Sequence, residues 1–141
     1  CADISRSWLC GDGPPSPEQR ELYAIGHAQL HYNLGLIKPG LAFREFAEIA
    51  YQLPPECIGH RYSCLAHGIG LCDEYPAIPY LEDFDRIGYD GTIREGMTLC
   101  VESLVGRDGG RESVKLEQQI LVTADGHRPL SSYPFETVLL P

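Results

Sequence analysis

The sequence has 141 residues, a length that suits one domain, and 43% of them are hydrophobic, which is enough to bury a sizeable core. Its formal net charge of -9 argues against a nucleic acid or an anionic membrane surface as a partner. No apolar run approaches the roughly 20 residues that a membrane-spanning helix needs. The six cysteines form no Cys-x-x-Cys pair, and several lie within apolar runs. We therefore expect buried free thiols in a reducing, cytoplasmic compartment.

The first eight residues are typical of the end of a strand that carries one acid, Asp3. The sequence begins there without an initiator methionine, with Cys1 already inside the strand-like stretch. We therefore expect a chain that is truncated at its N-terminus. Any site built by this strand would then lack some of its ligands.

A helix is predicted after the turn-rich stretch 11–15. Ser16 is a suitable N-cap, followed by Pro at the first helical position and by Gln19 three residues after the cap. Spacings of three and four then predict one packed face, made of Leu22, Ile25, Gln29, Tyr32 and Leu36. His27 and His31 lie one turn apart and could clamp a metal ion. They fall away from the packed face, however, with no Glu between them to act as a general base, so a solvated surface is the favoured interpretation.

The sequence 38–40 (Lys-Pro-Gly) should end this helix, and a second amphipathic helix is predicted before Pro54 and Pro55. Its apolar face would contain Phe43, Phe46, Ala47, Ala50 and Leu53. The acidic stretch 81–90 is expected to be a surface loop and 136–140 a last edge strand. Two helices followed by antiparallel strands indicate an α+β fold.

A β-hairpin is the strongest local prediction. Two alternating apolar stretches, 98–105 and 112–123, flank Asp-Gly-Gly-Arg at 108–111. If the two glycines form the turn, Asp108 faces Arg111 and Glu102 lies directly opposite Glu117. Opposed carboxylates repel and need a shared proton or a cation between them. A solvated pair, or a bulge that shifts the register, is the alternative.

The acids and the imidazole expected to converge are Asp3, His67, Glu102 and Glu117. Such a set suits a divalent ion such as Mn²⁺, Fe²⁺, Co²⁺ or Zn²⁺. Taken alone, His67 is more readily explained as a core histidine with a satisfied ring. The glycines that follow it allow close backbone approach and leave the imidazole accessible.

Four motifs, in order, resemble those of the creatinase, prolidase and methionine aminopeptidase (M24) family, which has the pita-bread fold. They are residues 3–6 (Asp-Ile-Ser-Arg), residues 67–71 (His-Gly-Ile-Gly-Leu), the Gly-Met strand 95–102 that ends in Glu, and Glu117 with the strand and turn 120–126. The resemblance implies the C-terminal part of that fold, with helices packed on a curved antiparallel sheet. Residues 1–141 would then be a single truncated domain, the C-terminal catalytic portion.

The same resemblance implies a dinuclear metal site. Asp3 and Glu117 would bridge two divalent ions, and His67 and Glu102 would bind one of them. The first metal-binding Asp of the family would precede Cys1, so this sequence shows part of a larger ligand set. The family also suggests a homodimer.

One departure from the family pattern bears on the reaction. Peptidases of this family read His-Glu-x-Pro where this sequence reads Asp-Glu-Tyr-Pro at 73–76, so Asp73 stands in place of a histidine. A carboxylate there would repel a developing oxyanion but could serve as a proton-abstracting base. This weakens the alternative of a metallo-aminopeptidase or prolidase-like hydrolase.

The stretches 1–6, 67–76 and 112–117 resemble dimethylsulfoniopropionate lyases of the DddP type, which are non-peptidase members of the same fold. The resemblance implies a small-molecule substrate cleaved by β-elimination to dimethyl sulfide and acrylate. It also implies iron as the metal, with Mn, Co or Zn as alternatives. Asp73 would remove the α-proton, and Tyr62 could orient the substrate carboxylate or the base, although a packed strand tyrosine is an equal alternative. A non-catalytic binding protein is the third hypothesis, and the intact site motifs argue against it.

Overall fold

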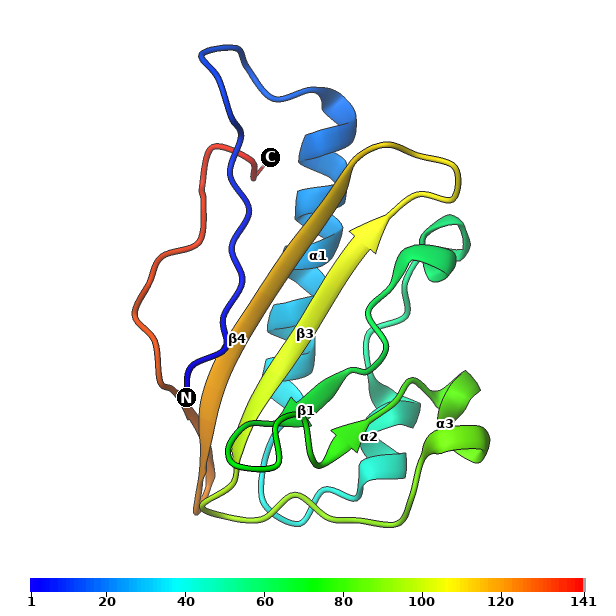
Figure 1. The fold of residues 1–141 in the computed structure, drawn as a ribbon, viewed down its shortest axis with the longest axis vertical. Helices are drawn as coiled ribbons and strands as arrows, with labels where there is room; N and C mark the ends of the chain where they lie inside the picture. The colour runs from blue at the N-terminus through cyan, green and yellow to red at the C-terminus, as the bar shows by residue number, and fades with distance from the viewer. Residues whose placement is uncertain (141) are drawn as a thin grey trace.

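A computed structural model describes residues 1–140 and shows an antiparallel sheet in the order β2-β1-β3-β4-β5. Figure 1 shows the long β3–β4 hairpin at the centre, with α1 running alongside it. No described helix is long and apolar enough to cross a membrane. The elements are α1 (Pro17–Leu36), α2 (Phe43–Ile49), the 3-10 helix η1 (Pro55–His60), β1 (Ala66–Gly68), β2 (Ala77–Ile78), α3 (Leu81–Ile87), β3 (Thr98–Gly106), β4 (Ser113–Thr123) and β5 (Gly126–Pro129).

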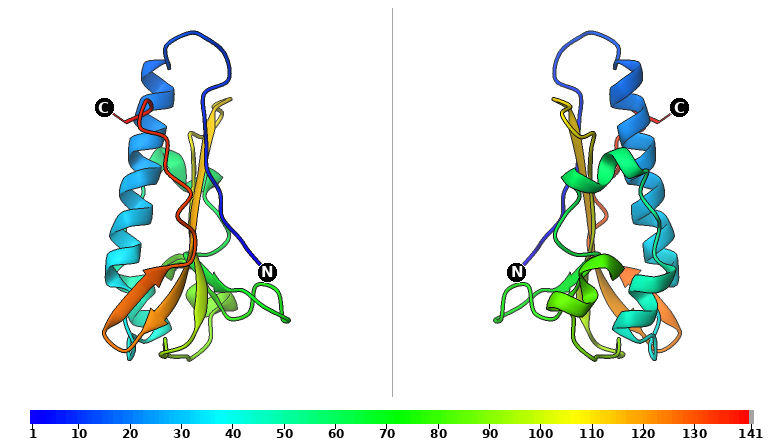
Figure 2. Two further views of the ribbon diagram at one scale, coloured as in Figure 1. Left: turned by 90° about the vertical axis from the view of Figure 1, so that its left-hand side faces the viewer. Right: turned by 90° about the vertical axis from the view of Figure 1, so that its right-hand side faces the viewer.

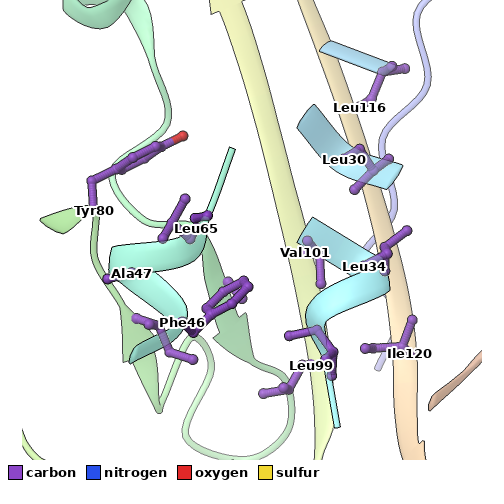
Figure 3. Close-up of a cluster of buried hydrophobic side chains, with 14 of the residues drawn as sticks. Leu30, Leu34, Phe46, Ala47, Leu65, Tyr80, Leu99, Val101, Leu116 and Ile120 are labelled. Atoms are coloured by element: carbon purple, nitrogen blue, oxygen red, sulfur yellow. The ribbon is translucent and has the colours of Figure 1, made fainter. Parts of the chain in front are cut away.

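The two faces of the sheet have different roles. Helix α1 covers one face, where Leu30 and Leu34 lie among the buried side chains of the hairpin (Figure 3). In Figure 2 the N-terminal segment and the β1–β2 connection lie on the other side of the sheet. Because side chains alternate along a strand, the residues between the core positions of β3 and β4 point to that second face. Glu102 and Glu117 are among them.

The predicted capping of α1 is confirmed, but its predicted packed face is partly wrong. The Ser16 hydroxyl accepts a hydrogen bond from the Gln19 backbone, and the Gln19 side chain accepts one from Ser16. Tyr32, however, is 52% exposed. The helix approaches the hairpin at Gly26, where an added Cβ would lie 3.3 Å from Ser103 Oγ. The buried face of α1 is therefore turned relative to the predicted face. It consists of Leu22, Tyr23, Gly26, Gln29, Leu30, Asn33 and Leu34.

Two predictions for the second half of the chain are wrong. The stretch 81–90 contains α3, because Phe84 is buried in the core and Arg44 stacks on its ring at 4.4 Å. The stretch 136–140 is a turn region, not an edge strand. There Arg20 donates hydrogen bonds to the carbonyls of residues 138 and 140, so a helix side chain replaces a strand as their partner. Strand β5 takes the edge position beside β4 instead.

The predicted hairpin register is confirmed, with Glu102 opposite Glu117. The predicted two-residue turn is wrong, because the strands end earlier and residues 107–112 connect them. Asp108 donates its backbone N–H to Glu56 O, on η1, and does not pair with Arg111 in the ladder. Gly109 has φ 72°, a left-handed conformation that favours glycine.

Candidate metal centre

The hairpin and β1 bring together the residues predicted for the site. His67 on β1 lies opposite Cys100 on β3. Cys100 is two residues from Glu102, which lies opposite Glu117 on β4. The N-terminal segment runs beside β4, where Ser5 and Glu117 exchange backbone hydrogen bonds. The predicted strand character of residues 3–8 is therefore confirmed at a single bridge. This bridge brings Asp3 next to the acids of the hairpin.

The His67 ring is the centre of the cluster. Its Nε2 atom lies 3.1 Å from Glu102 Oε1, 3.8 Å from Asp3 Oδ2 and 4.0 Å from Glu117 Oε1. His67, Glu102 and Glu117 are at most 2% exposed. All four predicted metal ligands therefore meet in one buried or half-buried site.

The hydrogen bond of the other ring nitrogen, Nδ1, determines which tautomer His67 adopts. Nδ1 lies 2.9 Å from the carbonyl oxygen of Gly68, which can only accept, so Nδ1 carries the proton. In the neutral ring the Nε2 lone pair then faces three carboxylates, which offer only further lone pairs. A proton or a cation must lie between them. Histidine ligands of metal ions usually donate the second N–H to a carbonyl in this way.

Glu117 contributes one satisfied and one unsatisfied oxygen. Ser5 Oγ donates a 2.8 Å hydrogen bond to Oε2, whereas Oε1 is buried with no hydrogen-bond partner among residues 1–140. Burial and the adjacent Glu117 carboxylate raise the pKa of Asp3. Both observations indicate a site with too few positive charges for its acids, which a divalent ion would correct.

Lys115 was missed by the sequence analysis. Its ammonium group contacts Glu102 Oε2, lies 3.8 Å from Glu117 Oε2 and stands 3.9 Å above the Tyr62 ring. Burial lowers the pKa of Lys115, against the opposing effect of Glu117 and Asp3. Strand alternation could have found it, because Lys115 and Glu117 are two residues apart on one face.

The cysteines were only partly predicted. Cys57, Cys64 and Cys100 are buried free thiols, whereas Cys1, Cys10 and Cys72 are exposed. Cys100 is not part of the hydrophobic core cluster but lies in the candidate metal centre. Burial and the Glu117 and Asp3 carboxylates raise the pKa of its thiol.

Arg6 fixes the N-terminal segment at the site. Its guanidinium donates hydrogen bonds to Glu117 O (2.5 Å), Gln118 Oε1 (2.6 Å) and Tyr133 O (2.9 Å), and it stacks 3.8 Å from the centre of the Phe135 ring. One side chain thus ties together residues 1–8, β4 and the C-terminal segment. Arg6 therefore helps to hold the segment that carries Asp3, together with the backbone hydrogen bonds between Ser5 and Glu117.

The two predicted catalytic residues are more exposed than His67, Glu102 and Glu117, since Asp73 is exposed and Tyr62 is half-buried. Asp73 lies in the exposed β1–β2 connection with φ 53°, and its backbone N–H donates to Gly70 O. Within residues 1–140, no hydrogen bond or ion pair joins its side chain to the four predicted ligands. Tyr62 donates to Glu74 Oε1 at 3.1 Å, and burial, together with this carboxylate, raises the pKa of its hydroxyl.

Gly68 shapes the connection that carries Asp73. Its N–H donates to Pro76 O, and an added Cβ would lie 2.1 Å from Tyr75 O. A larger residue would force the two backbone segments apart. The expectation of close backbone approach beside His67 is therefore confirmed at Gly68. The expectation of an accessible imidazole is wrong, because the His67 ring is fully buried against the carboxylates of Asp3, Glu102 and Glu117.

The second histidine pair is separate from this site. His27 and His31 have ring centroids 4.1 Å apart, and both pack against Phe135. Burial lowers the pKa of both residues; His31 adds to the effect on His27, and Arg6 adds to the effect on His31. His27 is only half-exposed, so the predicted solvated surface holds for His31 alone.

The residues present fit a divalent metal ion. An Nε2 lone pair, three converging carboxylates and an unpartnered buried oxygen form a donor set of nitrogen and oxygen ligands. Asp3, His67, Glu102 and Glu117 could hold such an ion.

Comparisons with known proteins show which family and which relatives this chain resembles. The model of metallopeptidase family M24 matches residues 1–124. The chain is 42% identical over 142 positions to the dimethylsulfoniopropionate lyase DddP of Roseovarius nubinhibens, covering 99% of this chain and 31% of the relative. It is 29% identical to the Xaa-Pro dipeptidase of Pyrococcus horikoshii, covering 97% of this chain and 37% of the relative. It therefore spans about a third of the length of these relatives.

Solved structures show the same fold. The Xaa-Pro dipeptidase of Bacillus anthracis superposes with a TM-score of 0.76 at 28% identity, covering 96% of this chain and 36% of that one. The prolidase of Pyrococcus furiosus superposes with a TM-score of 0.72 at 27% identity, covering 93% and 37%. The predicted α+β pita-bread fold is confirmed. The chain belongs to metallopeptidase family M24.

Proposed function

We propose that this chain is the C-terminal catalytic portion of a metal-dependent lyase that cleaves dimethylsulfoniopropionate to dimethyl sulfide and acrylate. Identity to two DddP lyases, 42% and 41% over 99% of the chain, carries the proposal. Identity to the aminopeptidases and dipeptidases of the family is 27–30%. Asp73, in place of a peptidase histidine, supports the same choice of reaction.

In the proposed site Asp3, His67, Glu102 and Glu117 would hold two divalent ions, iron first, with manganese, cobalt or zinc as alternatives. Bound ions would supply Lewis acidity that makes the α-proton of a carboxylate substrate more acidic. The half-buried and buried positions of these residues limit access of water to the site.

The proposed base is Asp73. Its carboxylate would take the α-proton, the electrons of that C–H bond would form the α–β double bond, and neutral dimethyl sulfide would leave from the β-carbon. The β1–β2 connection that carries Asp73 lies on the same side of the sheet as the N-terminal segment (Figure 2). Tyr62, beside Lys115 and hydrogen-bonded to Glu74, would orient the substrate carboxylate or the base.

We propose that this chain is part of a longer protein. The ligand set of this chain is short for two ions, and the chain spans about a third of its relatives, 31% of the DddP lyases. We expect a preceding segment to supply further acids. A homodimer and a cytoplasmic location are parts of the same proposal.

The test compares Asp73→Asn with Asp12→Asn, an exposed matched control, in the full-length protein loaded with iron. Headspace dimethyl sulfide and acrylate are measured together with metal content. We expect Asp73→Asn to lower kcat by roughly 100- to 10,000-fold with unchanged metal content. No dimethyl sulfide from the metal-loaded wild type would refute the lyase.

The alternative is a metallo-aminopeptidase or prolidase-like hydrolase, favoured by the family match and by the structural similarity to dipeptidases. Release of proline or of an N-terminal residue from peptides by the same preparation would support it. The lyase predicts no such release.

A further inference from the structure

Cys100 occupies a central position in the candidate metal centre. It lies on β3 between His67 on β1 and Gln119 on β4, and its side chain is fully buried. Its Sγ atom and one donor atom each of Asp3, His67 and Glu117 all lie within 4.8 Å of one another. The thiol therefore lies within 4.8 Å of a donor atom of each of these three residues.

Hydrophobic packing does not explain this thiol. Cys57 is a member of the hydrophobic core cluster, whereas Cys100 is not and faces away from α1. Within residues 1–140, its Sγ atom makes a 3.6 Å hydrogen-bond contact with the backbone oxygen of Asp3. A small apolar residue would satisfy a core position, but Cys100 lies among acids and an imidazole.

A second observation indicates a ligand at the same point. Glu117 is 2% exposed, and its Oε1 atom has no hydrogen-bond partner among the described residues. An unpaired buried carboxylate oxygen is costly unless a cation binds it. An ion that satisfies Glu117 Oε1 and the His67 Nε2 lone pair would lie within reach of Cys100 Sγ.

We propose that Cys100 is a further metal ligand and that its thiolate binds one of the two ions of the site. This inference rests on the proposed metal site. On binding, the S–H bond breaks, a sulfur–metal bond forms and the proton leaves to solvent, so no oxidant or reductant is needed. A thiolate among carboxylates would make the site softer and favour zinc or iron over manganese or magnesium.

The test uses cobalt(II) as a spectroscopic probe in the full-length protein. The exposed Cys1, Cys10 and Cys72 are replaced by serine, because they could bind cobalt adventitiously. Bound cobalt gives weak visible bands, and a thiolate ligand adds a strong charge-transfer band in the near ultraviolet. We expect both, and we expect Cys100→Ser to remove the near-ultraviolet band while the visible bands remain. The matched control, Cys57→Ser, should keep both.

The outcomes separate the two proposals. Visible bands without a near-ultraviolet band in the parent protein would refute the role of Cys100 and leave the metal site intact, whatever the variants do. A near-ultraviolet band that survives Cys100→Ser, or that is lost equally in Cys57→Ser, would refute it as well. Failure of the parent protein to bind cobalt at all would refute both the metal site and the thiolate ligand.

Discussion

Lys115 on β4 reaches across the hairpin, and its ammonium group contacts the carboxylate of Glu102, which is 1% exposed. In the absence of a metal ion this lysine is the cation closest to the acids of the hairpin among the ion pairs of residues 1–140. A divalent ion bound by Glu102 and Glu117 would compete with it for the same oxygens. Lys115 therefore links the stability of the metal-free protein to the metal site.

Replacing Lys115 by methionine tests this link. Without metal, Lys115→Met leaves Glu102 buried and unpaired, so we expect the free energy of unfolding to fall by about 3 kcal/mol. Bound zinc should remove most of that loss. Urea denaturation with EDTA and with zinc measures both values, and the exposed Lys38→Met serves as the control. An equal loss in both conditions would contradict the competition.

Replacing Arg6 by lysine tests how the N-terminal segment is held. A lysine keeps the charge but cannot donate at once to Glu117 O, Gln118 Oε1 and Tyr133 O. We expect faster amide hydrogen exchange in residues 1–8 and at least tenfold weaker metal binding by calorimetry, because Asp3 loses its fixed position. Arg20→Lys, which alters two contacts to the C-terminal segment, is the control. Unchanged exchange in Arg6→Lys would show that other contacts hold the segment.

The hairpin connection should be sensitive to the left-handed conformation of Gly109. An alanine at φ 72° costs about 1–2 kcal/mol. Gly13→Ala is the matched control, since an added Cβ meets nothing within 4 Å and its φ is not positive. Urea denaturation should show a loss for Gly109→Ala alone. Equal stabilities of the two variants would contradict the conformation described for Gly109.

The His27–His31 pair should make stability depend on pH. Burial lowers both pKa values in the folded state, with Arg6 opposing protonation of His31. The unfolded chain then binds more protons below about pH 6.5, so the free energy of unfolding should fall as pH drops through that value. Urea denaturation at a series of pH values measures the slope.

The double variant His27→Gln/His31→Gln should flatten that slope. His60→Gln, at an exposed histidine, should leave it unchanged. The phenyl ring of Phe135 packs against both imidazoles and covers part of their surface. A slope that is the same in the double variant and in the wild type would assign the pH dependence to other groups.

Local features were predictable where the cause is local. The capping residues of α1 act within one turn, and the alternation of β3 and β4 around a glycine-rich connection sets the register of Glu102 and Glu117. Helix α3 was missed because Phe84 is held by the core and by Arg44, contacts that no acidic local pattern reveals. The exposure of Tyr32 was not predicted either, because the buried face of α1 is set by its packing on the hairpin at Gly26.

The sequence by itself determined the hairpin register and the family resemblance, and it predicted Asp3, His67, Glu102 and Glu117 as ligands, since strand alternation and motif spacing are local features of the chain. Strand alternation puts Lys115 on the same face as Glu117, but only the tertiary structure decided that this lysine and Cys100 lie against residues of the other strands. Lys115 and Cys100 enter the site because β1, β3 and β4 lie side by side and because Arg6 fixes the N-terminal segment against β4. Distances between residues a hundred positions apart depend on packing, and packing is not encoded in any one segment.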